Sequence, residues 1–207
     1  MEREIAQLIA VYPKCISKLY VFLKSLLTPF GSLDSSLPKA GSICDLGCGS
    51  GMYSIYLWLK SGKRRVIGVD QSPSRIAYAK QVSSHIPNLT FGVTDFNKAY
   101  TLPGADAYLI NDVLHHIPDE GKRNLIAKVY SRMPKEGILV IKDMTKRHKV
   151  KFFLNYVNDI IMTRYQPLHF IAREDLTNLL ETAGFRVRSR EINGYLFPHV
   201  IYLCTKA

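Results

Sequence analysis

A glycine-rich turn is the first feature of this chain that could do chemistry. It reads Asp45-Leu-Gly47-Cys-Gly49-Ser-Gly51 and directly follows the apolar run Ser42-Ile43-Cys44. A buried strand that ends in closely spaced glycines lets the main chain approach a nucleotide-like ligand, because glycine has no side chain in the way. Backbone N–H groups and the N-terminus of the following helix then face that ligand. The turn predicts a site for a nucleotide-like ligand but does not identify that ligand.

An acidic residue ends the second expected strand. Asp70 closes the run Arg65–Asp70, nineteen positions after Gly51. At that place a carboxylate can accept both ribose hydroxyls of a nucleoside lying across the strand ends. Gln71 follows, where it could lie against the base. Alternatively, Asp70 only caps the next helix, but its distance from the glycine turn favours ligand binding.

Polar residues also follow the third and fourth expected strands. After the third, Asp95 could accept a hydrogen bond from an exocyclic adenine amine, and Phe96 could pack beside it. The fourth runs into the segment Asn111-Asp112-Val113-Leu114-His115-His116-Ile117-Pro118. The carboxyl ends of parallel strands share one edge, so three successive strands deliver polar groups to the same rim. A ligand site explains this coincidence better than capping or solubility does.

The elements that must position these residues alternate between short apolar strands and helices. The expected strands are Ser42–Leu46, Arg65–Asp70, Leu89–Val93, Ala107–Ile110 and Ile138–Lys142. The expected helices are Met52–Leu59, Pro73 to about Ser84 with Ser72 as its cap, Glu120–Tyr130 and Ala172–Ala183. This alternation predicts an α/β fold with a doubly wound parallel sheet covered on both faces. Two last strands, Phe185–Glu191 and Val200–Thr205, predict an antiparallel hairpin at the sheet edge.

With 207 residues, 47% of them hydrophobic and 22% charged, the chain is typical of one soluble globular domain. We divide the expected domain, residues 1–207, into a helical cap (1–40), a ligand-binding core (41–144), a helical lid (145–170), and a last helix with the hairpin (171–207). The cap is expected to be interrupted at Pro13 and to end in the loop Ser32–Pro38. The four cysteines form no C-x-x-C pair. We therefore expect reduced thiols in the cytoplasm and no metal site. No apolar run is long enough to span a bilayer.

Taken together, these motifs resemble the class I S-adenosylmethionine-dependent methyltransferases. The resemblance covers most of residues 41–144 and rests on Asp45–Gly51, Gly68-Val69-Asp70, Thr94-Asp95-Phe96, Asn111–Pro118 and Met133–Val140. It implies a Rossmann-like, seven-stranded sheet that is mostly parallel with an antiparallel last strand, and S-adenosyl-L-methionine as the cofactor.

The resemblance also implies roles for individual residues. Asp45 and the glycines would hold the methionine moiety, Asp70 the ribose, and Asp95 would face adenine. The backbone carbonyl of Asn111 would lie near the amino group of the ligand. The full set expected around the cofactor is Asp45, Gly47, Cys48, Gly49, Gly51, Asp70, Gln71, Asp95, Phe96, Asn111 and His116.

A nicotinamide-dependent oxidoreductase shares the glycine turn and the acid after the second strand. Three features disfavour it. The glycine turn is followed by Met52-Tyr53 and has no third glycine at the dinucleotide spacing. Asp45 stands where the dinucleotide fingerprint is apolar, and Asp95 would repel a pyrophosphate.

Methyl transfer from a sulfonium requires an in-line nucleophile, and positioning alone can supply much of the rate. A base is needed only where the acceptor must lose a proton. His115 and His116 follow the fourth strand near the expected methyl group and are candidate catalytic residues, as is Tyr165. Alternatively, the two histidines belong to a structural turn of this superfamily. His169 and Asp143 are further candidates that can equally be packing groups.

The segments expected to cover the acceptor are apolar and aromatic with basic edges. At the N-terminus these residues are Tyr12, Tyr20, Phe22 and Phe30. In the lid, an apolar face from Phe152 to Ile161 follows the basic run Lys146–Lys151. By resemblance to small-molecule relatives, both segments predict a small hydrophobic acceptor, either lipid-like or aromatic. The basic run could also contact an anionic membrane, although an ordinary lid helix beside a solvated charge run explains the same pattern.

Two other functions stay open. The net charge of +11 is compatible with RNA methylation. Nucleic acid is nevertheless disfavoured, because the basic residues are scattered as well as clustered and no RNA-binding module is added. A non-catalytic protein that binds S-adenosylmethionine is the second alternative, which the complete set of cofactor residues disfavours.

Overall fold

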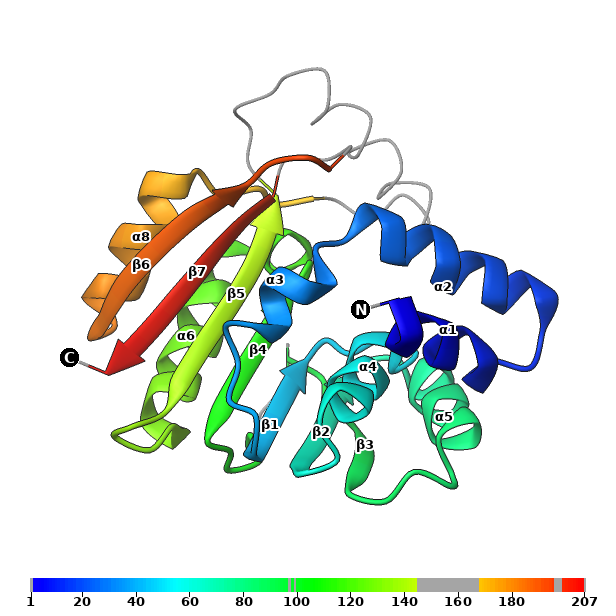
Figure 1. Cartoon of the computed structure of the whole chain (residues 1–207). Coiled ribbons are helices and arrows are strands. Elements are labelled where there is room, and N and C mark those ends of the chain that lie inside the picture. Colours follow the sequence, from blue (N-terminus) through cyan, green and yellow to red (C-terminus); the bar gives the residue numbers. More distant parts are fainter. Residues whose placement is uncertain (1, 97, 99, 145–167, 196–198, 207) are drawn as a thin grey trace.

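The fold is that of a computed structural model, which describes residues 2–96, 98, 100–144, 168–195 and 199–206 (Figure 1). Seven strands form one sheet in the order β3-β2-β1-β4-β5-β7-β6. The strands are β1 (Gly41–Leu46), β2 (Arg64–Asp70), β3 (Leu89–Val93), β4 (Ala107–Asn111), β5 (Ile138–Met144), β6 (Phe185–Ile192) and β7 (His199–Lys206). The predicted Rossmann-like doubly wound sheet is confirmed.

Only the last strand runs against its neighbours. Strands β1 to β5 pair in parallel, whereas β7 pairs antiparallel with both β5 and β6. The predicted C-terminal hairpin is therefore present, with β6 at the edge and β7 inserted beside β5. This insertion places His199 opposite Met144, at the carboxyl end of β5.

Burial explains why the central strands read as continuous apolar runs. All residues of β1 after Gly41 are buried, and so are the first four residues of β4. Strands covered on both faces have no side for polar residues. The edge strand β6 alternates instead, and its exposed positions carry Arg186, Arg188 and Arg190. Charged side chains on an edge strand disfavour pairing with another chain.

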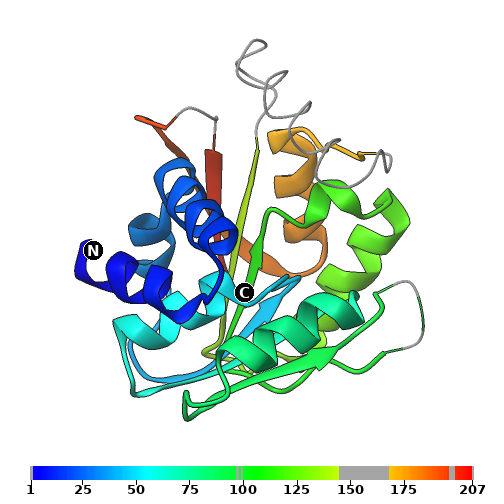
Figure 2. The same cartoon turned by 90° about the vertical axis from the view of Figure 1, so that its right-hand side faces the viewer.

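Helices cover both faces of the sheet (Figure 2). One face packs against α4 (Met52–Lys60) and α5 (Pro73–Val82). The opposite face packs against α6 (Asp119–Arg132) and α8 (Arg173–Thr182). Ser72 caps α5 as predicted, because its hydroxyl accepts the Arg75 N–H at 3.4 Å. A single turn of 3₁₀-helix, η1 (Leu114–His116), follows β4.

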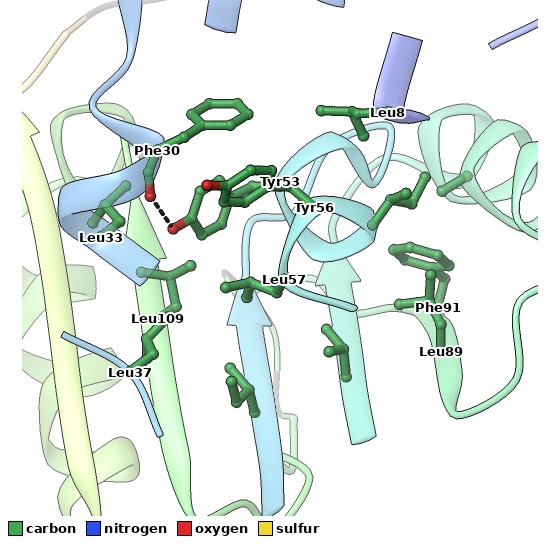
Figure 3. Close-up of a cluster of buried hydrophobic side chains, with 14 of the residues drawn as sticks. Leu8, Phe30, Leu33, Leu37, Tyr53, Tyr56, Leu57, Leu89, Phe91 and Leu109 are labelled. Atoms are coloured by element: carbon green, nitrogen blue, oxygen red, sulfur yellow. Dashed lines mark hydrogen bonds between the residues drawn. The ribbon is translucent and has the colours of Figure 1, made fainter. Parts of the chain in front are cut away.

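Three helices form the N-terminal part, with the expected break at Pro13: α1 (Glu2–Val11), α2 (Cys15–Leu27) and α3 (Phe30–Asp34). The loop expected over 32–38 is partly wrong, because α3 extends into it as far as Asp34. A buried ion pair of 2.6 Å between Arg64 of β2 and Asp34 ties α3 to the sheet. Beside it, Phe30 packs edge-on against Tyr53, whose hydroxyl donates to the Phe30 carbonyl at 3.1 Å (Figure 3).

The burial of Tyr12 and Phe30 bears on their expected role in the acceptor pocket. Both are buried in the hydrophobic core, so neither is available to line an open acceptor pocket, and that part of the sequence interpretation is wrong. The lid helix expected over 145–170 lies outside the described residues as far as 167, together with its basic run and Tyr165. Within the described part of the chain, every helix is too short or too polar to cross a membrane.

Candidate functional site

The glycine turn after β1 adopts a conformation that side chains would prevent. Gly47 and Gly51 have φ angles of 79° and 80°, in the left-handed region. A Cβ at Gly47 would overlap Val113, and one at Gly51 would lie 2.6 Å from the ring of Phe91. The N–H groups of Gly47 and Cys48 both donate to the Val69 carbonyl of β2, at 2.7 and 3.0 Å. The turn is therefore fixed against β2 by its own backbone.

The α-carbon of Gly49 faces open space, unlike those of Gly47 and Gly51. Among the described residues, nothing lies within 4 Å of the position that a Cβ at Gly49 would take. Cys48, by contrast, turns its side chain inward, with its Sγ 2.8 Å from the position of a Cβ at Gly68. Burial raises the pKa of this thiol. The middle of the turn thus offers an open backbone surface, supported from beneath by Cys48.

Asp70 connects the turn to the start of α5. Its Oδ2 accepts the Gly49 N–H and its Oδ1 accepts the Ser72 N–H, both at 2.9 Å. Ser72, not Asp70, supplies the side-chain cap of α5. An ionised carboxylate has about four acceptor sites. Asp70 can therefore accept further hydrogen bonds from a ligand at the rim while it holds the backbone at Gly49 and Ser72 in place.

Asp45 is the second carboxylate of this half of the rim. It is buried, and its Oδ2 accepts the hydroxyl of Ser54 in α4 at 2.6 Å. Burial raises the pKa of Asp45 to about 6, and the nearby charge of Asp70 acts in the same direction. A positively charged group bound beside Asp45 would favour its ionised form.

The other residues expected around the adenine are more exposed. Asp95 follows β3 and forms a loose ion pair of 3.5 Å with Lys98. Phe96 packs edge-on against Tyr100, with ring centroids 5.4 Å apart. Gln71 is exposed at the end of β2. All three lie at the carboxyl edge, since the Thr94 N–H donates to the Asp70 carbonyl at 3.0 Å.

The half of the rim formed by β4, β5 and β7 is built from pairs of side chains. Lys142 of β5 is buried, and its Nζ lies 2.6 Å from both carboxylate oxygens of Asp112. Asp112 has a φ of 56°, in the left-handed region, at the point where the chain leaves β4. Lys142 holds the pKa of Asp112 below its usual range. Beside this pair, buried His199 has its Nε2 2.9 Å from the Leu27 carbonyl of α2.

His115 and Asp143 form a second buried pair on this half. The His115 Nδ1 lies 2.6 Å from Asp143 Oδ1. The His115 ring stacks on Phe170 with centroids 5.4 Å apart, and its carbonyl accepts the His169 N–H at 2.7 Å. The structure thus brings three sequence candidates together: His115 and Asp143 by side chains, and His169 by its backbone. Tyr165 lies outside the described residues.

His116 differs from its neighbour. Burial, and then the charge of His115, lower the pKa of His116 to about 4. It is therefore neutral near pH 7. Its Nδ1 is buried and, like the side-chain oxygen of Asn111, has no hydrogen-bond partner among the described residues. Both groups lie at the end of β4, on the side of the rim nearest the glycine turn.

The sequence interpretation did not single out Lys142, Asp112 or His199. A lysine at the end of an otherwise apolar strand was the only signal for Lys142. Residues 2–96, 98, 100–144, 168–195 and 199–206 contain no group of three or more His, Cys, Asp or Glu side chains that could hold a metal ion.

The residues of the glycine-turn half fit S-adenosylmethionine. Two carboxylates suit a ligand that carries a sulfonium, an amino group and ribose hydroxyls. The open face of Gly49 leaves room beside them for the methionine moiety. The side-chain oxygen of Asn111, which no described residue contacts by a hydrogen bond, is an acceptor at the same edge.

Comparisons with known proteins agree with this fit. A family model described as "Methyltransferase domain" matches residues 37–184. The carboxy-S-adenosyl-L-methionine synthase of Campylobacter jejuni is 23% identical over 197 residues, covering 86% of this chain and 83% of that protein. Among solved structures, human N-acetylserotonin methyltransferase in complex with S-adenosylmethionine has a TM-score of 0.70 and 21% identity. It covers 92% of this chain, which spans only 56% of the human protein.

Magnesium protoporphyrin IX methyltransferase from Synechocystis, with bound S-adenosylhomocysteine, has a TM-score of 0.66 and 21% identity, covering 86% of this chain and 80% of that one. At such identities the solved structures show the fold. The family model, which matches most of the chain, shows the family. The chain belongs to the methyltransferase-domain family and is a class I S-adenosylmethionine-dependent methyltransferase.

Proposed function

We propose that this protein transfers the methyl group of S-adenosylmethionine to a small hydrophobic acceptor in the cytoplasm. The observation that carries the proposal is the buried His115–Asp143 pair, which lies on the same edge of the sheet as the glycine turn and Asp70. A base beside the cofactor site suits an acceptor that must lose a proton. Four free cysteines support a reducing compartment.

In this proposal the glycine-turn half binds the cofactor. Asp70 accepts the ribose hydroxyls, and Asp95 with Phe96 and Gln71 surrounds the adenine. Asp45, the turn from Gly47 to Gly51 and the end of β4 hold the methionine moiety. The cofactor supplies an activated methyl group on a positively charged sulfur. Asp45 stays ionised beside that charge, even though its burial alone favours the protonated form.

The half formed by β4, β5 and β7 binds and deprotonates the acceptor. Asp143 accepts the Nδ1 proton of His115, which leaves Nε2 of the ring as the proton acceptor. His115 takes the proton of the acceptor hydroxyl, and Asp143 stabilises the imidazolium that results. His115 is buried and stacks on Phe170, so side chains around it must move for the acceptor to reach its Nε2. His116 is neutral near pH 7 and serves as a hydrogen-bonding group.

The known proteins support a small acceptor. N-acetylserotonin and magnesium protoporphyrin IX are the compounds named for the two methyltransferases of similar fold. Phe170, which stacks on His115 in the acceptor half, suits an acceptor with an apolar or aromatic body.

The likeness to carboxy-S-adenosyl-L-methionine synthase supports a second candidate reaction, because it extends over most of both chains. In such a reaction the cofactor itself would gain a carboxyl group from a separate carboxyl donor, and no acceptor would be methylated.

Product analysis separates these functions. The purified protein is incubated with S-adenosylmethionine and a metabolite extract, and products are identified by mass spectrometry. Our proposal predicts S-adenosylhomocysteine together with a methylated small molecule that survives ribonuclease treatment. A carboxylated cofactor would favour the synthase reaction, a ribonuclease-sensitive product would indicate RNA, and no turnover of bound cofactor would indicate a binding protein.

In the same assay, Asp143→Asn tests whether Asp143 positions the His115 ring for proton transfer. We expect it to lower kcat while the affinity for the cofactor stays unchanged, and to alter the pH profile of kcat. His115→Ala removes the proposed base itself. His85→Ala, at an exposed histidine after α5, is its matched control. Equal turnover in wild type, Asp143→Asn and His115→Ala would exclude the proposed base.

A further inference from the structure

Helix α2 (Cys15–Leu27) has an unusual distribution of apolar side chains. Six of its large hydrophobic residues are exposed: Ile16, Leu19, Tyr20, Phe22, Leu23 and Leu26. Ile16 is 80% exposed and Leu26 is 58% exposed. Val21 is the one residue of this helix that is buried. A helix that packs on its own domain normally buries its apolar stripe, so this arrangement is reversed.

The reversal is fixed by contacts on the inner side of the helix. The Tyr78 hydroxyl of α5 donates to Ser17 at 2.9 Å, and Val21 lies one turn further on. The Leu27 carbonyl contacts His199 at 2.9 Å. At about 100° per residue, the six exposed apolar residues cover an arc of about 160°, and Ser17 and Val21 lie opposite its centre. The body of the protein holds the helix by the narrow side that carries Ser17 and Val21.

Charge completes the pattern. Between Glu4 and Asp34 the sequence contains three lysines and no acidic residue. On the helix, Lys18 lies at one border of the apolar arc, and Lys14 precedes the first turn. Lys24 lies at the other border, where its charge also acts on the Asp112 carboxylate. Basic side chains at the borders of an apolar face can keep their ammonium groups in a headgroup region while their stems lie along the apolar surface.

We infer that α2 docks this protein on an anionic lipid surface, with its apolar arc inserted at the level of the headgroups. The partner is set by charge complementarity: the helix carries only positive charges, and the whole chain has a net charge of +11. The helix lies beyond the carboxyl ends of the strands, on the side of the molecule that holds the glycine turn (Figure 1). Docking would therefore bring the active edge close to the bilayer.

Cys15 offers a direct readout. It is exposed at the start of α2, whereas Cys44 and Cys204 are buried and Cys48 is partly buried with a raised thiol pKa. An environment-sensitive fluorophore on Cys15 reports on the lipid-facing side, because this residue lies within the same arc. Its emission is followed while vesicles of phosphatidylcholine, with or without phosphatidylglycerol, are added to the full-length protein.

We expect a blue shift and co-sedimentation with vesicles that contain phosphatidylglycerol, and neither with pure phosphatidylcholine at low salt. Salt at about 0.5 M should weaken the binding by about tenfold or more. The double variant Phe22→Ser with Leu26→Ser should weaken it at least about tenfold. Val93→Ser, at an exposed valine of β3, is the matched apolar control and should bind as wild type does.

Lys18→Glu should also weaken binding, whereas Lys135→Glu, in the turn before β5, should not. Circular dichroism and the affinity for S-adenosylhomocysteine show that each variant is folded. Absence of binding to phosphatidylglycerol vesicles at low salt would overturn the inference. So would a double variant that binds like wild type, or a wild-type dimer that the double variant converts to a monomer without any vesicle binding. Because vesicle binding needs no methyl acceptor, its failure leaves the proposed methyl transfer standing.

Discussion

The two halves of the carboxyl edge are built by different means. Around β1 and β2, Asp70 is held by the backbone N–H groups of Gly49 and Ser72, and Asp45 by the hydroxyl of Ser54. Around β4, β5 and β7, side chains hold one another, in the Lys142–Asp112 and His115–Asp143 pairs. The first half is positioned mainly by backbone groups of the turns that follow β1 and β2, and the second by ion pairs between side chains. Substitutions should therefore affect ligand binding most in the first half and stability or turnover most in the second.

The largest effect is expected from Lys142→Ala. Removal of the buried lysine leaves the Asp112 carboxylate, whose side chain is 21% exposed, without its partner, which costs at most about 3–5 kcal/mol. Chemical denaturation should show this loss in the free energy of unfolding. Lys142→Met combined with Asp112→Asn removes both charges and should restore most of it, whereas exposed Lys135→Ala should change it little. If the single variant Lys142→Ala is as stable as wild type, the Lys142–Asp112 pair does not contribute to the free energy of unfolding.

Asp70→Ala should weaken binding of S-adenosylhomocysteine by about 2–3 kcal/mol, or roughly a hundredfold, because two backbone donors lose their charged acceptor and the ribose loses its own. Isothermal titration calorimetry measures the change. Asp175→Ala, at an exposed acid of α8, is the control. If Asp70→Ala folds normally and binds with wild-type affinity, the ribose is not held there.

Asp45→Asn should separate stability from binding. The folded-state pKa of Asp45 is raised from its ordinary value of 3.8 to about 6, so the stability of the fold falls as the pH rises from about 4 to about 6 and stays lowered above that range. The asparagine variant should therefore be more stable than wild type at pH 8, by about 1–3 kcal/mol. The difference should vanish below about pH 4, where the carboxyl is protonated in both folded and unfolded chains.

The same substitution should weaken cofactor binding, because the neutral amide cannot balance the positive charge of the ligand. For wild type, affinity should fall as the pH is lowered through about 6. Thermal denaturation and calorimetry across this pH range check both expectations. Equal stability of the two proteins at pH 8 would contradict the burial of a charged Asp45.

The smallest effect is expected from His116→Asn. His116 is already neutral near pH 7, since its pKa is lowered to about 4. Its replacement by another neutral side chain should leave the pH profile of kcat between pH 6 and 8 unchanged, whereas His115→Ala should abolish the dependence on a base. A profile that changes with His116→Asn alone would move the base from His115 to His116.

Sequence reasoning could predict the β1–β2 half because its signals are local. The glycine turn and Asp70 depend on strand ends, residue spacing and left-handed glycines, all of which are visible along the chain. The sheet and its reversed last strand were predicted from the same alternation together with the family resemblance.

The other half depends on distant contacts. Lys142 meets Asp112 only because β5 lies beside β4 and Asp112 adopts a positive φ, which non-glycine residues seldom do. His199 reaches the site only because β7 inserts next to β5. The outward face of α2 was also unexpected, since an apolar helical pattern normally predicts burial.

Hydrogen–deuterium exchange of the full chain, with and without S-adenosylhomocysteine, tests the central assignment most directly. We predict that the ligand slows exchange in the glycine turn (45–51), after β2 (70–72) and after β3 (94–96), and leaves the turn before β5 (133–137) unchanged. Saturable binding with no slowing at 45–51 and 70–72 would contradict the assignment of the cofactor to this edge.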